Sequence, residues 1–208
     1  WLREPVRERP SHPTVPLGGA LPDPDLRRLL VIVGIFSLGN SSNAFLLLRA
    51  RDLGWSETGV IALYAVFNCV YAAAATPLGS LSDRLGRRTL VLGGFAVAAL
   101  VYGAFALASS PWTAALLLAV YGLYVAATAG AGKAWVADLA RDRGLATAMG
   151  WYQMVTGIGL LGASLLAGAL WSAFGAPAAF TVSCVLSLLC CLLLLAWPPE
   201  TTDGPVAR

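Results

Sequence analysis

The chain has 208 residues, of which 58% are hydrophobic and only 12% are charged, and its formal net charge at pH 7 is +3. Soluble domains contain roughly 25% charged residues, so this composition excludes an ordinary soluble domain and indicates a protein whose surroundings are lipid. The four cysteines, Cys69, Cys184, Cys190 and Cys191, all fall in apolar runs. We expect them to be small buried side chains, which excludes the disulfide framework of a small secreted domain.

The first 28 residues differ in composition from the rest of the chain. They contain half of the twelve prolines, mixed with charged residues, and such a stretch cannot bury a hydrophobic core. We therefore expect an extended cytoplasmic linker over 1–28. The sequence opens on Trp1-Leu2 without a methionine, and we expect it to continue from a preceding segment.

Four long runs contain no Asp, Glu, Lys or Arg: 29–48, 58–82, 89–132 and 144–199. A helix needs about 20 apolar residues to cross the hydrocarbon core of a bilayer. The first two runs therefore supply one span each, and the last two supply a pair each, because turn-forming residues divide them. The predicted fold is an all-α integral membrane protein, with a domain over 29–197 and a cytoplasmic tail over 198–208. Its six transmembrane helices are expected at 29–49, 57–79, 89–109, 113–137, 145–170 and 177–197.

The arginines predict the orientation of this bundle. With six spans, both termini share one side with the turns near 80–88 and 138–144. Positively charged segments stay in the cytoplasm, so we expect both termini on the cytoplasmic side of a bacterial-type cytoplasmic (plasma) membrane. The net charge then reflects topology and contact with anionic membrane lipid, not nucleic-acid binding. That side has eleven arginines, against Arg49 and Arg51 opposite: Arg3, Arg7, Arg9, Arg27, Arg28, Arg84, Arg87, Arg88, Arg141, Arg143 and Arg208.

The turn after the second span is the most sharply patterned part of the chain. Gly86 can adopt the positive φ of a tight turn, and Gly79 can permit close approach of a neighbouring helix. Asp83 can cap a helix or pair with an arginine. The alternative is a turn whose arginines only signal topology. The pattern, within "PLGSLSDRLGRRTLVLGG" (77–94), consists of Gly79, Asp83, Arg84, Gly86, Arg87 and Arg88.

This pattern resembles the loop signature G-x-x-x-D-R-x-G-R-R of the major facilitator superfamily of secondary transporters, and all six defining positions match. The segments "NSSNAFLLLRA" (40–50) and "KAWVADLARDRGLATAMG" (133–150) also look like the second half of bacterial members. The resemblance covers about 29–197. It implies the C-terminal six-helix half of a twelve-helix bundle, built as a 3+3 inverted repeat, that moves a small solute by alternating access.

The resemblance also implies two sets of partners. An N-terminal six-helix half, in the same longer chain or separate, would complete the transporter. The charged turn would act as a conformational latch that closes in one access state. Exposed ion pairs usually contribute less than about 1 kcal/mol, so the latch would bias an equilibrium. Its partners in this chain would be Asp138, Arg141, Asp142 and Arg143.

Polar side chains indicate which spans line a solute path, because they are costly in lipid and usually face the interior of a bundle. They gather in spans one, two, four and five, whereas spans three and six have only an isolated Tyr102 and scattered Ser, Thr and Cys. Tyr64, Asn68 and Tyr71 share one helix face by their i, i+4, i+7 spacing. The predicted path residues are Asn40, Asn43, Tyr64, Asn68, Tyr71, Tyr121, Tyr124, Lys133 and Gln153.

Single members of this set have alternative roles. Each tyrosine could equally form an interhelical hydrogen bond or anchor the chain at the membrane interface. Lys133 could extend to cytoplasmic water from the end of its span, or it could be a cavity cation for an anionic group of the substrate.

Other functions lack the residues that they need. Gly157–Gly162 matches G-x-G-x-x-G, but a dinucleotide site requires a preceding strand, and inside an apolar span such glycines indicate close helix packing. The single histidine, His12, lies in the linker, and paired intramembrane acids are missing from the sequence. We expect no enzyme activity, no cofactor and no metal. The alternative to a transporter is a non-transporting membrane scaffold, or a truncated half-transporter that needs a partner half.

Overall fold

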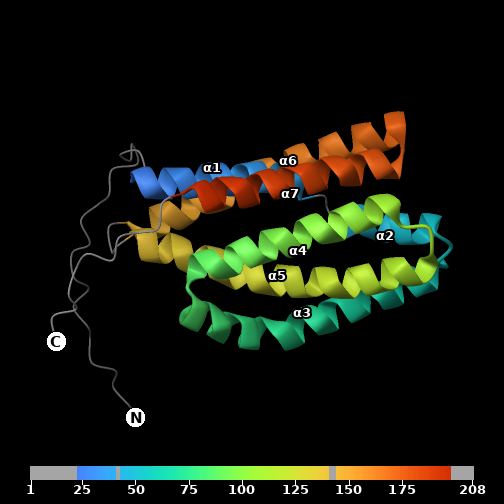
Figure 1. Ribbon diagram of the computed structural model, residues 1–208, viewed down its shortest axis with the longest axis horizontal. Coiled ribbons are helices and arrows are strands. Elements are labelled where there is room, and N and C mark those ends of the chain that lie inside the picture. Colours follow the sequence, from blue (N-terminus) through green and yellow to red (C-terminus); the bar gives the residue numbers. More distant parts are fainter. Residues whose placement is uncertain (1–22, 41–42, 141–143, 198–208) are drawn as a thin grey trace, which may run out of the picture.

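The computed structural model describes residues 23–40, 43–140 and 144–197, and in these residues the chain is helical with short connections (Figure 1). Six stretches are long and apolar enough to cross a membrane, which confirms the predicted all-α fold. The helices are α1 (Pro24–Gly39), α2 (Asn43–Asp52), α3 (Glu57–Leu85), α4 (Arg87–Leu107), α5 (Pro111–Ala140), α6 (Leu145–Phe174) and α7 (Ala176–Ala196).

The first helix begins at Pro24, within the segment predicted as linker. The Asp23 side chain accepts a hydrogen bond from the backbone amide of Asp25 at 3.2 Å, and Pro24 occupies the first helical turn. Both features favour a helix start, since the side chain satisfies a free amide and proline has no amide to satisfy. Arg27 and Arg28 are therefore helical, and residues 1–22 lie outside the described part of the chain.

The first span is two helices rather than one. α1 ends at Gly39, Asn40 has non-helical dihedrals (φ −82°, ψ 80°), and α2 begins at Asn43. Gly39 and Asn40 favour such an interruption, because glycine and asparagine both favour non-helical backbone. Irregular backbone at membrane depth is tolerated where it faces protein or a water-filled cavity. The break is therefore a candidate position for a binding site.

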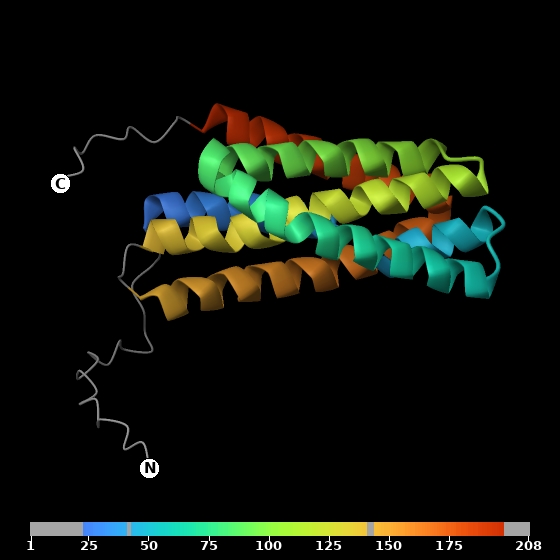
Figure 2. The same cartoon turned by 90° about the horizontal axis from the view of Figure 1, so that it is seen from below.

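The helices pack as an inverted repeat. Spans one to three contain α1 to α4, and spans four to six contain α5 to α7. α3 packs on α5, α1 packs on α6, and α4 packs on α7. The second span of each group of three therefore packs on the first span of the other group. Figure 2, seen from the side of α3, shows α3 crossing over α5. α1, α4 and α5 have the largest buried shares, and α3 and α6 the smallest.

The two ends of the bundle contain different connections (Figure 1). The start of α1, the α3–α4 turn, the end of α5 and the end of α7 lie at one end, which we call the terminal end. At the opposite end, Arg49 Nη2 donates to the Ala108 carbonyl at 2.8 Å, and Trp55 Nε1 donates to the Pro111 carbonyl at 2.7 Å. These bonds tie the α2–α3 connection to the α4–α5 connection.

A glycine permits close packing of α6 on α1. Gly159 on α6 lies so near α1 that an added β-carbon would overlap the Ser37 β-carbon and stand 3.4 Å from the Gly34 carbonyl oxygen. At Gly157 the added atom would meet nothing within 4 Å. The G-x-G-x-x-G sequence thus lies within a helix, as predicted, and its second and third glycines lie close to α1, Gly159 against the Ser37 β-carbon and Gly162 against the Leu38 side chain.

The cysteines agree only partly with the prediction. All four are free thiols; Cys190 and Cys191 are buried, and Cys184 is half-buried. Cys69 is exposed on α3, because this helix buries little of its surface within the chain. The expectation that it is buried within this chain was wrong.

Candidate functional site

A cavity of about 550 Å³ lies beside the break in the first span. Asn40 and Asn43, on the two sides of the break, both line it, so the interrupted backbone faces this cavity. α1, α5 and α6 supply most of the remaining wall. Its other lining residues are Val33, Phe36, Ser37, Tyr64, Val91, Phe95, Tyr121, Tyr124, Val125, Thr128, Ala129, Gly132, Tyr152, Thr156 and Leu160.

Five of the nine predicted path residues meet in this cavity: Asn40, Asn43, Tyr64, Tyr121 and Tyr124. The aromatic rings form a continuous group, in which the Tyr121 and Tyr124 centroids are 5.1 Å apart. Polarity along the sequence is sufficient to find these residues, because each places its polar group on the inner face of its helix.

Lys133 and Gln153 do not line the cavity, and both are exposed. Their neighbours Gly132 and Tyr152 line it instead. Adjacent residues on an α-helix differ by about 100° in direction, so one step along the helix turns each polar side chain away. Lys133 and Gln153 thus lie outside this cavity, and their place on the solute path stays a prediction.

Asn68 and Tyr71 also lie outside the cavity. Asn68 is exposed, and its amide donates to the Tyr64 carbonyl at 2.7 Å, one turn earlier on α3. An amide that bonds to its own helix satisfies itself without a facing partner. Of the predicted polar face of α3, only Tyr64 reaches the cavity.

Asn40 is the centre of the polar contacts in the site. Its Oδ1 accepts from the Tyr102 hydroxyl at 2.7 Å and from the Tyr121 hydroxyl at 3.2 Å. Tyr102 is fully buried and bonded to Asn40, so it is not the isolated polar residue that the sequence suggested. These two bonds connect α4 and α5 to the break after α1.

The third span contributes to the cavity through apolar side chains that polarity cannot identify. Val91 and Phe95 of α4 line it, and the Phe95 ring stacks on Phe36 of α1 with centroids 3.9 Å apart. The prediction that only spans one, two, four and five line the cavity therefore omitted α4. α7, the sixth span, has no residue in the lining, as expected.

The cavity combines aromatic surface with uncharged hydrogen-bonding groups. Among the described residues that line it, none has a formal charge. Its hydroxyl and amide groups can donate and accept hydrogen bonds, and its rings can stack on a planar or apolar group. This wall can therefore hold a neutral polar or aromatic part of a solute, but it offers no counter-charge.

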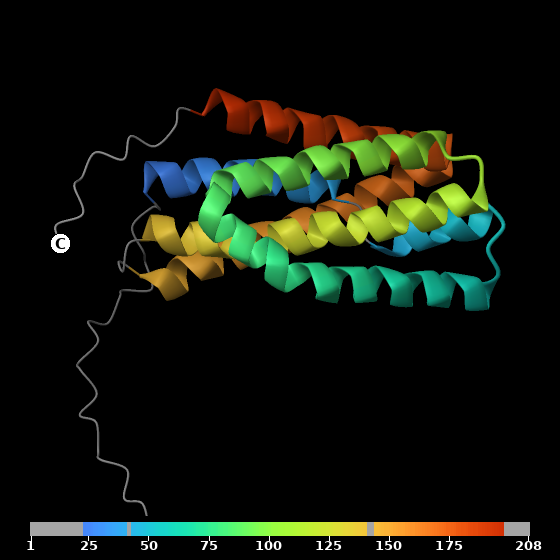
Figure 3. The ribbon, with the colours of Figure 1, turned by 60° about the horizontal axis from the view of Figure 1, so that its bottom comes forward.

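The charged pattern is not a loop, because α3 continues through it to Leu85. Pro77 lies inside α3, where it removes a backbone donor, and Figure 3 shows the C-terminal part of α3 bending towards the start of α4. Gly86 alone separates the two helices, with φ +89° and ψ 144°. Its φ is positive, as expected, but this region is open essentially only to glycine and differs from the left-handed helical one.

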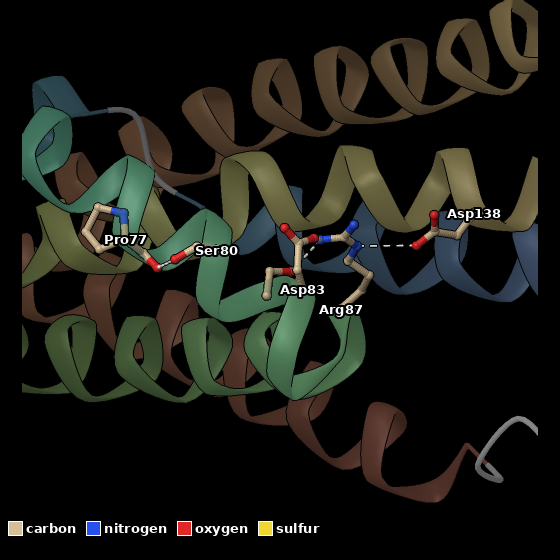
Figure 4. A network of polar contacts seen from close by, with 6 residues as sticks. Pro77, Ser80, Asp83, Arg87 and Asp138 are labelled. Carbon is tan, nitrogen blue, oxygen red and sulfur yellow. Dashed lines mark hydrogen bonds and ion pairs between the residues drawn. The ribbon is translucent and has the colours of Figure 1, made fainter.

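Arg87 joins the two halves of the predicted latch (Figure 4). Its guanidinium donates to Asp83 on α3, to the Ser82 hydroxyl at 3.2 Å and, through Nε, to Asp138 Oδ2 on α5 at 3.3 Å. Asp83 and Asp138 are exposed. The arrangement is a weak, solvent-facing link between the end of α3 and the end of α5.

The other residues of the pattern have different surroundings. Arg88 donates to the carbonyls of Leu194, at 2.6 Å, and Trp197 at the end of α7. Arg84 is exposed. A β-carbon added at Gly79 would meet nothing within 4 Å, so the expected close approach is not made by a described residue. Arg141, Asp142 and Arg143 lie outside the described residues.

A six-span membrane bundle with a broken helix beside an uncharged cavity is the architecture of half of a secondary transporter. The sequence pattern of the Major Facilitator Superfamily matches residues 29–208, and the chain belongs to this superfamily.

The chain is similar to an uncharacterized MFS-type transporter from Methanocaldococcus jannaschii. The two are 37% identical over 177 residues, which cover 82% of this chain and 44% of that protein. The chain thus spans less than half the length of this relative. Family and composition together establish a multi-pass membrane protein of the transporter class.

Proposed function

We propose that the chain is the C-terminal half of a transporter that moves a small solute by alternating access, and that the solute binds at the cavity beside Asn40. The single observation behind this proposal is the coincidence of the broken first span with an uncharged, aromatic cavity. In secondary transporters, discontinuous helices expose backbone groups to a solute near the middle of the membrane.

The solute is proposed to present a neutral polar or aromatic surface to this wall. A charged group without a counter-charge is expensive in a site of low polarity, and the described cavity lining supplies none. Tyrosine rings and amide groups instead suit a planar compound with hydrogen-bonding edges.

The missing wall of the path is proposed to be an N-terminal six-helix half that covers α3 and α6. Within the chain, only 11% and 17% of the most apolar stretch of these two helices is buried, whereas 39–50% is buried in the other spans. Tyr64 on α3 and Tyr152 on α6 both line the cavity, so a second half on this face would close the path from the other side.

The terminal end is proposed to be cytoplasmic. Of the described arginines, Arg27, Arg28, Arg84, Arg87 and Arg88 belong to the terminal end, whereas Arg49 and Arg51 belong to the opposite end. This asymmetry favours a cytoplasmic terminal end by the positive-inside rule. The link Asp83–Arg87–Asp138 would then be a cytoplasmic latch.

The proposal can be tested on the transporter at its natural length. A panel of neutral, anionic and cationic compounds is screened by thermal shift, and compounds that bind are then tested for uptake into liposomes. We expect neutral aromatic compounds among those that bind, and Tyr121→Phe to weaken their binding. Tyr71→Phe makes the same chemical change on α3 outside the cavity and should have no effect.

Two outcomes would contradict the proposal. Equal loss of binding in Tyr121→Phe and Tyr71→Phe would show that the solute does not bind in the cavity. Binding without uptake of any compound in the panel would favour the alternative, a non-transporting membrane scaffold or an incomplete half-transporter.

A further inference from the structure

A second hollow lies at the terminal end of the bundle, between the start of α1 and the end of α7, and we call it the α1–α7 groove. It has a volume of about 660 Å³ and shares no lining residue with the central cavity. Since α7 does not contribute to the central cavity, the groove is distinct from the proposed solute path.

The wall of the groove is apolar along its length and cationic at its mouth. On α1, Val31 lies about one helical turn from both Arg27 and Arg28. On the opposite wall, Ala196 at the end of α7 and Trp197 directly after it lie about one turn from Leu193. Val31 is 60% exposed, so apolar surface is left uncovered next to two guanidinium groups.

The charges around the mouth favour an anion. Arg28 has one carboxylate neighbour, Asp25, at 3.5 Å, and the side chain of Asp23 caps α1. Arg27 makes no ion pair with any described residue. Among the described residues, Arg27 therefore has no carboxylate partner for its positive charge at the start of α1.

The end of α7 would ordinarily oppose an anion, because the C-terminal carbonyls of a helix have partial negative charge. Arg88 removes this obstacle, since its guanidinium donates to the carbonyls of Leu194 and Trp197. The carbonyls at the end of α7 are thus partly neutralised, and the charged side chains that line the groove are Arg27 and Arg28.

We propose that the α1–α7 groove binds an acidic phospholipid, with the phosphate against Arg27 and Arg28 and one acyl chain along Val31, Leu193 and Ala196. Basic pockets between membrane helices on the cytoplasmic side recognise anionic headgroups. Burial of an acyl chain against apolar side chains contributes favourable free energy. The site relies on the proposed cytoplasmic orientation of the terminal end, but lipid binding is measured without any transport assay.

The test is native mass spectrometry of the natural-length protein in a non-ionic detergent. Phosphatidylglycerol or phosphatidylcholine with the same acyl chains is added in increasing amounts. We expect phosphatidylglycerol to bind more tightly. Each cation near a charged headgroup contributes about fivefold in affinity, so the double variant Arg27→Gln/Arg28→Gln should weaken phosphatidylglycerol binding at least fivefold and leave phosphatidylcholine unchanged.

Two further variants separate a built site from general electrostatic attraction. Arg51→Gln/Arg84→Gln removes the same charge from exposed positions outside the groove and should not change the affinity. Ala196→Trp fills the groove while keeping both arginines and should reduce phosphatidylglycerol binding. Equal affinity for the two lipids, equal loss in both double variants, or full binding by Ala196→Trp would each overturn the proposal. Loss of solute transport with normal lipid binding would contradict only the proposed function.

Discussion

Replacing Gly159 by alanine tests the close crossing of α1 and α6. An added β-carbon would overlap the β-carbon of Ser37 on α1. That atom is fixed by the backbone and cannot rotate away, so α1 and α6 must separate. Gly157→Ala is a matched control on the same helix, because its β-carbon would meet nothing within 4 Å.

The magnitude follows from comparing the two variants. Both gain the helix propensity of alanine over glycine, about 1 kcal/mol, and this gain cancels in their difference. Overpacking at position 159 costs about 1–3 kcal/mol, so Gly159→Ala should be less stable than Gly157→Ala by that amount. For a chain of this size, each kcal/mol corresponds to roughly 2–4 °C in Tm.

The assay is thermal unfolding in detergent, followed by loss of the monodisperse peak in size-exclusion chromatography. Equal Tm values for the two variants would refute the close crossing of α1 and α6. Because α6 places Tyr152 and Thr156 in the cavity, Gly159→Ala should also weaken solute binding, whereas Gly157→Ala should not.

Three more substitutions test single contacts. Tyr102→Phe removes one of two hydrogen bonds to Asn40 and should lower the free energy of unfolding by roughly 0.5–1.5 kcal/mol in the same thermal assay; an unchanged Tm would show that the bond contributes nothing. Asp83→Asn weakens one contact of Arg87 while Asp138 remains, so cysteine labelling of the proposed cytoplasmic vestibule should change less than about fivefold. If both labelling and transport stay as in the unmodified protein, the pattern is only a topology signal. Lys133→Gln should leave solute affinity unchanged, because Lys133 lies outside the cavity; weakened binding would return it to the path.

The sequence was sufficient for the number of spans, because a crossing helix needs about 20 apolar residues and charged or turn-forming residues separate one span from the next. It located the broken region less well. The run 29–48 contains no charged residue, so the absence of charge predicts one continuous span. It does not show that a helix ends at Gly39.

Residues of the site could be predicted from the sequence only where a polar side chain also lies on the face of its helix that lines the cavity. Tyr121 and Tyr124 were found because their polar groups lie on the inner face of α5. Lys133 lies outside the cavity although Gly132 lines it, because the sequence spacing does not fix which way a helix is rotated about its axis, and one residue changes the direction by about 100°. Phe95 was missed because an apolar residue in a cavity and one in a core have the same sequence signal.

The two tyrosine hydroxyls on Asn40 have a consequence for ligand exchange. An amide oxygen has two lone pairs, and Tyr102 and Tyr121 occupy both. A solute that donates a hydrogen bond to this oxygen must displace one of the hydroxyls. Such a molecule replaces an internal hydrogen bond, and its arrival removes one of the two bonds that connect α4 and α5 to the end of α1.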